Sequence, residues 1–124
     1  MRYRPEAASE GVSFLTDTDR LEQEWVRFLL CEAERDLVFL WNITAGSFGG
    51  PAYASEELPS VIARIATALI KSGCKVGFGN PDGDAWQTDA RLLNAENPGT
   101  TIAARWLANP KDVEFLVFAR RRSC

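Results

Sequence analysis

Carboxylates near the middle of the chain are the side chains that first invite a chemical interpretation. Asp82, Asp84 and Asp89 lie close together around Gly83. Carboxylate oxygens can bind Ca²⁺, and two carboxylates facing each other across a cleft can serve a hydrolase as acid and base. The spacing does not match the calcium-loop pattern D-x-[DN]-x-[DN]-G, and the distal Glu is missing. We therefore interpret these residues as parts of a turn and keep a carboxylate-dependent enzyme as the third hypothesis for function.

Two glycines just before this turn resemble the start of a phosphate-binding loop. The dinucleotide-binding pattern G-x-G-x-x-G needs a third glycine, and Asp82 stands at that position after Gly77 and Gly79. The pattern G-x-x-x-x-G-K-[ST] does not occur either. The glycines therefore predict a bulge or a close approach of two strands, and we expect no cofactor and no metal ion.

Composition excludes several reaction mechanisms. The chain of 124 residues contains no histidine, so Ser-His, Cys-His and zinc-histidine mechanisms are impossible. A net charge of −3 argues against binding to nucleic-acid phosphates. Cys31, Cys74 and Cys124 contain no C-x-x-C pair and leave an odd one over, which favours reduced, buried thiols over a disulfide framework. Because the sequence also shows neither a secretion signal nor a membrane span, we expect a cytoplasmic protein.

Charge and aromatic side chains point to a surface for a protein partner. Residues 1–36 hold nine acidic residues and five arginines, which suits either a solvated helix face or a surface that docks a basic protein. Phe48, Tyr53 and Trp86 lie beside turns, where aromatic rings are available as interface anchors. The residues that we predict to contact a partner are Glu22, Glu24, Phe48, Tyr53, Asp82, Asp84 and Trp86.

Residues 55–86 give the strongest structural signal. The apolar residues of its helical part form one stripe, made of Leu58, Val61, Ile62, Ile65, Ala66, Leu69 and Ile70. Ser55 is the expected N-cap, and Gly73 supplies a left-handed exit. A strand over 74–79 follows, and Asp82-Gly83 predicts a hairpin that leads back to Trp86.

The rest of the chain supplies further helices and strands. We predict a helix from about Asp19, a third helix after Asn97-Pro98, and a last strand over 113–119. Residues 37–41 are apolar on both alternating faces, which is typical of a central strand. A strand, a helix and a strand in this order favour a parallel pair with a right-handed crossover. The glycine-rich connection 44–54 is expected to be a mobile loop.

These elements predict an α/β or α+β fold: a single domain over residues 16–120, with a mixed sheet of three to five strands and about three helices. Residues 1–15 are expected to be flexible, and 121–124 to be a basic tail. The predicted core consists of Trp25, Phe28, Leu29, Val38, Leu40, Ile62, Ile65, Leu69, Val76, Trp106, Phe115 and Val117.

About half of the chain, residues 58–118, resembles a group of small bacterial αβ proteins, some of which look like immunity proteins of contact-dependent or other polymorphic toxin systems. The similarity lies in the Leu/Ile-rich helix with Gly73 and Gly77, in Trp86, in Ile102 and Trp106 on a helix, and in the aromatic strand 115–118. The resemblance implies a protein that occludes a toxin domain and has no catalytic activity.

The first hypothesis for function is therefore a non-catalytic domain that binds a protein such as a basic toxin domain, with no nucleic acid or membrane as partner. The alternative is a small-molecule-binding or regulatory domain with the glycine-rich 44–54 loop as a lid. The sequence leaves the oligomeric state open.

Overall fold

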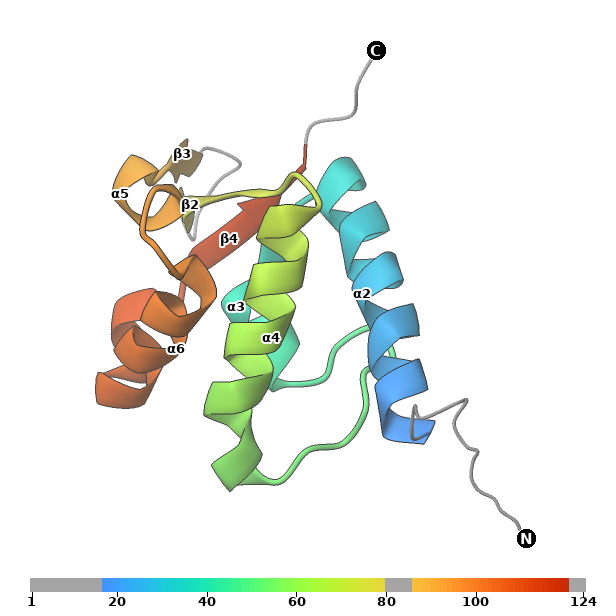
Figure 1. Ribbon diagram of the computed structural model, residues 1–124. Helices are drawn as coiled ribbons and strands as arrows, with labels where there is room; N and C mark the ends of the chain where they lie inside the picture. Colours follow the sequence, from blue (N-terminus) through green and yellow to red (C-terminus); the bar gives the residue numbers. More distant parts are fainter. Residues whose placement is uncertain (1–16, 80–85, 121–124) are drawn as a thin grey trace, which may run out of the picture.

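The computed structural model describes residues 17–79 and 86–120, which form helices and a small sheet (Figure 1). This part of the chain holds five α-helices, two 3₁₀ turns and four strands, so the expected mixed αβ fold is confirmed. The expected flexible start, 1–15, and the expected basic tail, 121–124, lie outside the described residues. The elements are α2 (Asp17–Arg35), β1 (Val38–Phe39), α3 (Leu40–Thr44), η1 (Ser55–Glu57), α4 (Leu58–Lys71), β2 (Lys75–Gly79), β3 (Trp86–Thr88), α5 (Ala90–Leu93), α6 (Pro98–Ala108), η2 (Pro110–Val113) and β4 (Leu116–Ala119).

The sheet is antiparallel, with the strand order β1-β4-β2-β3. The predicted parallel pair of the strands near residues 38 and 76 is therefore wrong, and the sheet has four strands as expected but is antiparallel instead of mixed. Both strands run in the same direction, but β4 lies between them, and Phe118 is the register partner of Val38 on one side and of Val76 on the other. The last strand is thus an inner strand of the sheet, and its residues Leu116, Val117 and Phe118 are all buried.

The predicted strand 37–41 is only partly a strand. β1 ends at Phe39 at the edge of the sheet, and the chain turns at once into helix α3. The carboxamide oxygen of Asn42 accepts a hydrogen bond of 2.8 Å from the Phe39 backbone N–H, which ends the strand and starts the helix. Leu40 and Ile43 then point into the core, while Trp41 remains half exposed.

Helix α4 follows the predicted apolar stripe. Its buried residues are Val61, Ile62, Ile65, Ala66 and Leu69. Ser55 begins a 3₁₀ turn ahead of the helix instead of capping it directly, and the Glu57 carboxylate accepts the Ala54 backbone N–H at 2.8 Å. Gly73 has φ +105°, so the left-handed exit is confirmed.

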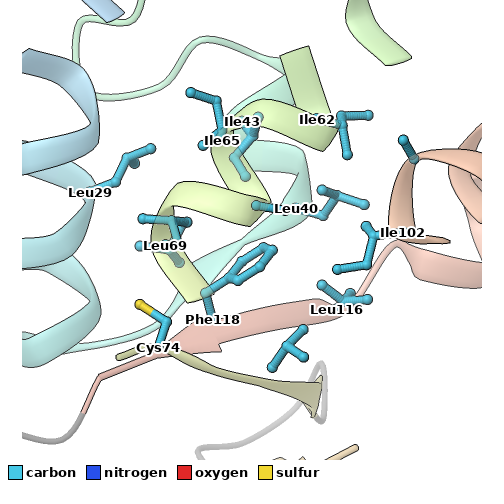
Figure 2. Close-up of a cluster of buried hydrophobic side chains, with 14 of the residues drawn as sticks. Leu29, Leu40, Ile43, Ile62, Ile65, Leu69, Cys74, Ile102, Leu116 and Phe118 are labelled. Atoms are coloured by element: carbon cyan, nitrogen blue, oxygen red, sulfur yellow. The ribbon is translucent and has the colours of Figure 1, made fainter. Parts of the chain in front are cut away.

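The core lies between the helices and one face of the sheet (Figure 2). Ten of its side chains are labelled there: Leu29, Leu40, Ile43, Ile62, Ile65, Leu69, Cys74, Ile102, Leu116 and Phe118. Most of the predicted core is confirmed, but Phe28 is 49% exposed, and Trp106 and Phe115 are only partly buried.

Helices α4 and α6 pack closely because Gly99 has no side chain. A Cβ atom at Gly99 would lie 2.5 Å from the Ala63 backbone oxygen and would also meet the Thr67 hydroxyl. Gly77 has a similar role in the β2–β3 hairpin, where a Cβ would collide with the Gln87 backbone of the neighbouring strand. The predicted close approach of two strands at the glycines is therefore confirmed.

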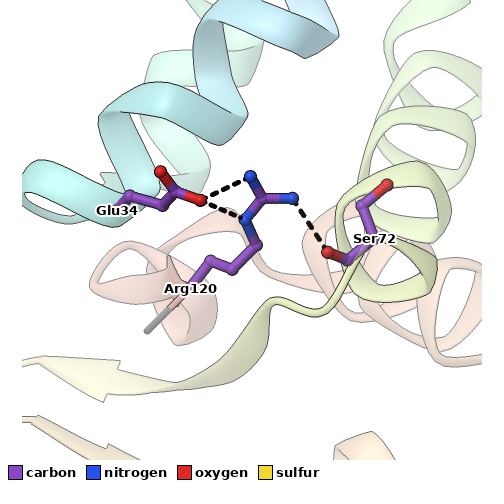
Figure 3. A network of polar contacts seen from close by, with 3 residues as sticks. All are labelled: Glu34, Ser72 and Arg120. Atoms are coloured by element: carbon purple, nitrogen blue, oxygen red, sulfur yellow. Dashed lines mark hydrogen bonds and ion pairs between the residues drawn. The ribbon is translucent and has the colours of Figure 1, made fainter. Parts of the chain in front are cut away.

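Arg120 ties the ends of three elements together (Figure 3). Its Nε donates to the Glu34 carboxylate at 2.9 Å, and Nη1 donates to the Ser72 carbonyl at 3.0 Å. Glu34 belongs to the last turn of α2, Ser72 follows α4, and Arg120 follows β4. This guanidinium thus links α2 and α4 to the end of the central strand.

Candidate functional site

Helix α2 carries a row of exposed residues on the side away from its core face. Its core face consists of Trp25, Leu29 and Ala33, at intervals of four residues. Leu21 and Phe28 are seven residues apart, so they share a second face, and they are 50% and 49% exposed. Glu24 lies between them on the same face and is exposed too. The helix therefore has two apolar rows, of which only one is used for folding.

The ring of Phe48 extends this exposed row from the following loop. It stacks on Phe28 with 5.7 Å between ring centroids and an angle of 23° between the planes. Phe48 has φ +64°, a left-handed conformation that bulky residues rarely adopt, and it is still 42% exposed. Leu21, Glu24, Phe28 and Phe48 are called the α2 aromatic surface below.

The loop that carries Phe48 is fixed to α2 from within. The indole N–H of Trp25 donates to the Ser47 carbonyl at 2.7 Å. Gly50 lies so close to this indole that a Cβ atom would come within 2.5 Å of a ring carbon. The Ser47 backbone N–H in turn donates to the Asn42 carbonyl at 2.9 Å. Phe48 is therefore held at its position by bonds and contacts on both sides of it.

Glu22 and Tyr53, two of the predicted partner contacts, meet between α2 and α4. The Glu22 carboxylate accepts two hydrogen bonds from Arg64 Nε, at 3.1 and 3.2 Å, and lies 3.0 Å from Arg64 Nη2. The Glu22 side chain is only 13% exposed. The hydrogen bonds to Glu22 raise the pKa of Arg64 above its ordinary value, which favours the charged form of Arg64. The two opposite charges therefore join α2 to α4.

The hydroxyl of Tyr53 is buried beside this pair. Within the described part of the chain, no atom makes a hydrogen bond of acceptable geometry with it. Burial raises the pKa of Tyr53, the nearby Glu22 carboxylate raises it further, and Arg64 lowers it. Arg64 and Glu22 also line an open groove of about 490 Å³ between the helices, whose rim carries charges of both signs.

Most acidic side chains of α2 are neutralised by arginines. Of its six acidic residues, four are in ion pairs: Asp17 with Arg20, Glu22 with Arg64, Glu32 with Arg35 and Glu34 with Arg120. Glu24 has no ion-pair partner among residues 17–79 and 86–120. The acidic charge that α2 presents is therefore smaller than its composition suggests, and Glu24 on the α2 aromatic surface is an unpaired carboxylate within the described ranges.

The remaining predicted contacts lie elsewhere. Asp82 and Asp84 lie outside the described residues. Trp86 belongs to β3, which is one edge strand of the sheet, whereas β1 is the other edge strand. The loop with Phe48 follows β1 and α3, so Trp86 and Phe48 belong to segments at opposite ends of the strand order. Asp89, the third carboxylate of that region, caps α5 by accepting the Leu92 backbone N–H at 3.1 Å. The structure thus brings Glu22 together with Tyr53, while Glu24 shares a face of α2 with Phe28, on which Phe48 stacks.

Phe28 is the functional candidate that the sequence pattern missed. Its position among apolar neighbours led to a core assignment, although Leu21 and Phe28 repeat at seven residues beside the separate row of Trp25 and Leu29. Two such rows are wider than one core-facing stripe. This excess width was the available signal for a second, exposed face.

Two features are absent from the described ranges: a metal-binding cluster and a membrane-spanning helix. In the described ranges, no group of three or more His, Cys, Asp or Glu side chains could hold a metal ion. None of the helices in those ranges combines the length and the apolar character that crossing a bilayer requires.

The cysteines differ in their surroundings. Cys31 is exposed on α2 and Cys74 is buried in the core, and both are free thiols. Burial raises the pKa of the Cys74 thiol to about 11. Comparison with known proteins returned no matching family model, no matching curated protein and no matching solved structure.

Proposed function

We propose that this chain is a protein-binding domain, of the immunity or inhibitor kind, that contacts its partner through the α2 aromatic surface. The observation that carries the proposal is Phe48, whose ring stacks on Phe28 and stays exposed on a left-handed backbone. A bulky residue with positive φ costs of order 1–3 kcal/mol and persists only where the surroundings impose it. Such strain, found in an exposed aromatic residue, is typical of a binding site.

A protein is the partner that this surface suits. Large aromatic rings near the centre of an interface supply most of the binding energy, and Phe28 and Phe48 together with Leu21 form such a centre. Glu24 adds an unneutralised carboxylate between the apolar residues, and the chain as a whole carries a net charge of −3. A basic domain complements both features, which agrees with occlusion of a basic toxin domain.

The proposal includes a cytoplasmic location and no catalytic activity. Cys31 and Cys74 are free thiols, which suits a reducing compartment. The proposed mode of action is steric: the bound domain covers a surface of its partner.

The test is binding to the product of the gene adjacent to that of this chain, first by co-purification and then by titration calorimetry. We expect Phe28→Ala to weaken binding at least about tenfold, since loss of an anchor costs roughly 2 kcal/mol. Glu24→Lys should mainly slow association with a basic partner. Gln23→Lys is the matched control, because it places a lysine on α2 but not on the exposed row.

Charge reversal at Glu22 is not a clean test, because it would break the Arg64 ion pair inside the domain. The proposal is wrong if the partner binds the Phe28→Ala chain as tightly as the wild type, provided that the variant keeps the circular dichroism spectrum of the folded domain.

A further inference from the structure

A second hollow is lined by residues of α3, of α6 and of the η2 turn and the residue after it. It has a volume of about 170 Å³. Leu40 and Val113, which are buried, form its floor. Two indole rings and a proline ring line it above them: Trp41, Trp106 and Pro110. The remaining lining residues are polar: Thr44, Lys111 and Glu114.

The size of this hollow indicates what enters it. Sites for metabolites and cofactors measure roughly 300–1,000 Å³ and enclose most of the ligand. A hollow of about 170 Å³ accepts a single side chain. The occupant is therefore one residue of a larger molecule.

One indole ring of the hollow packs against another ring, and both indoles keep unused donors. Trp41 is 50% exposed and stacks on Phe39 with 6.1 Å between centroids. Within the described ranges, the indole N–H groups of Trp41 and Trp106 donate no hydrogen bond, whereas that of Trp25 is bonded to Ser47. The residues that line the hollow thus combine apolar rings with two indole N–H groups that have no hydrogen-bond acceptor in the described ranges.

The charges around the hollow favour a neutral occupant. Lys111 and Glu114 both line it, they are exposed, and neither forms an ion pair with another described residue. Because the two charges have opposite signs, a charged side chain would be attracted by one of them and repelled by the other. An uncharged, apolar residue has no such conflict.

We propose that this hollow binds a proline side chain from an extended, polyproline-type segment of a partner protein. Such a segment makes no internal hydrogen bonds, so its carbonyl oxygens are free to accept from indole N–H groups. Its pyrrolidine rings are neutral, apolar and of single-residue size, and aromatic-lined grooves are the surfaces that bind them. This site is separate from the α2 aromatic surface and does not depend on the function proposed for it.

The four tryptophans of the chain make the proposal testable by ¹⁵N–¹H NMR of the indole groups. The probe is an oligoproline peptide of about ten residues, which forms this helix in water, and the control is a glycine-serine peptide of equal length. We expect oligoproline to shift the indole signals of Trp41 and Trp106 and to leave that of Trp25 unchanged, because its N–H is bonded inside the domain. Single Trp→Phe variants assign the signals.

Trp41→Ala should weaken oligoproline binding at least about tenfold, the loss typical of an interface anchor. Leu107→Ala is the matched control, because Leu107 is 66% exposed on α6 but does not line the hollow, and it should bind as the wild type does. Phe28→Ala should also bind as the wild type, which separates this site from the α2 aromatic surface. The proposal is overturned if oligoproline leaves both signals in place, if the control peptide shifts them equally, or if Trp41→Ala binds unchanged.

Discussion

Helices α2 and α4 pack against each other in the same layer, but they divide their apolar residues differently (Figure 1). α4 buries Val61, Ile62, Ile65, Ala66 and Leu69. α2 is longer, yet it buries only Trp25, Leu29 and Ala33 and leaves Leu21 and Phe28 half exposed. The difference shows that α4 is a folding element, whereas α2 both completes the core and presents apolar residues to the outside.

The charged residues of α2 also differ in role, because some of them bind other parts of the domain. Glu22 and Glu34 of α2 reach Arg64 of α4 and Arg120 after β4, so acidic residues join α2 to the rest of the domain. Part of the acidic composition of the first third of the sequence is therefore used for bonding inside the domain. Composition gives the charge of a segment, but the ion pairs decide how much of that charge a partner meets.

The largest effect is expected when an aspartate is placed on the buried face of α4 and, for comparison, on the exposed face of α2. Ile65→Asp buries a carboxylate at a position that is 1% exposed, and we expect a loss of more than about 4 kcal/mol in the free energy of unfolding, enough to unfold the domain. Phe28→Asp should cost no more than about 1.5 kcal/mol, the contribution of its ring stack. Urea unfolding followed by circular dichroism measures both. Equal losses would contradict the division of roles between α4 and α2.

A second test removes the link that holds both helices to the central strand. Arg120→Ala should lower the free energy of unfolding by about 1–3 kcal/mol, because Arg120 is mostly buried and its loss leaves Glu34 and the Ser72 carbonyl unpaired. Arg35→Ala is the control, since Arg35 is 71% exposed in its pair with Glu32 and should change stability by no more than about 0.5 kcal/mol. The comparison of urea midpoints decides, and a similar loss in both variants would refute the role of Arg120.

Local pattern predicted the helices best. The stripe from Leu58 to Ile70, the exit at Gly73 and the start at Asn97-Pro98 are visible in the sequence because each depends on residues that are close together in the chain. The strand predicted over 37–41 is too long, because a run of apolar residues has no periodicity that would distinguish a strand from a buried helix. In the structure, the side chain of Asn42 ends β1 after two residues. Strand order depends on long-range packing, which placed β4 in the centre.

The candidate site was only partly predictable for the same reason. Phe48 was chosen for its place in a glycine-rich loop, and the structure does place it on an exposed surface. Its partner Phe28 was missed, because an apolar residue on an amphipathic helix is usually a core residue. The pairing of Glu22 with Arg64 joins residues 42 positions apart, and no local rule connects them.

Tyr53 gives a pH test of the contact between α2 and α4. Burial raises the pKa of Tyr53 above its ordinary value of 10, so the folded domain holds the phenol proton more tightly than the unfolded chain does. The resulting stability is fully present below pH 10 and is lost as the pH rises through the raised pKa. Tyr53→Phe should therefore lose less stability than the wild type between pH 9 and the alkaline limit, as measured by urea midpoints. Cys74, whose pKa is raised to about 11, contributes equally to both chains and cancels in the difference.

The smallest expected effect concerns Phe48. It distinguishes the backbone strain at this residue from the contact of its ring with Phe28. At an ordinary loop position, glycine is less stabilising than alanine because it has more freedom to lose, and Ala45→Gly, at φ −85°, should follow that rule. At Phe48, with φ +64°, the order should reverse: both replacements lose the ring stack, but Phe48→Gly also relieves the strain and should be about 1 kcal/mol more stable than Phe48→Ala. If Phe48→Ala is instead the more stable variant, the backbone is not strained there. The expected order would show that the domain holds the exposed ring of Phe48 on a strained backbone that opposes folding. No residue of α4 has such a conformation. A loop with a purely structural role would not need it.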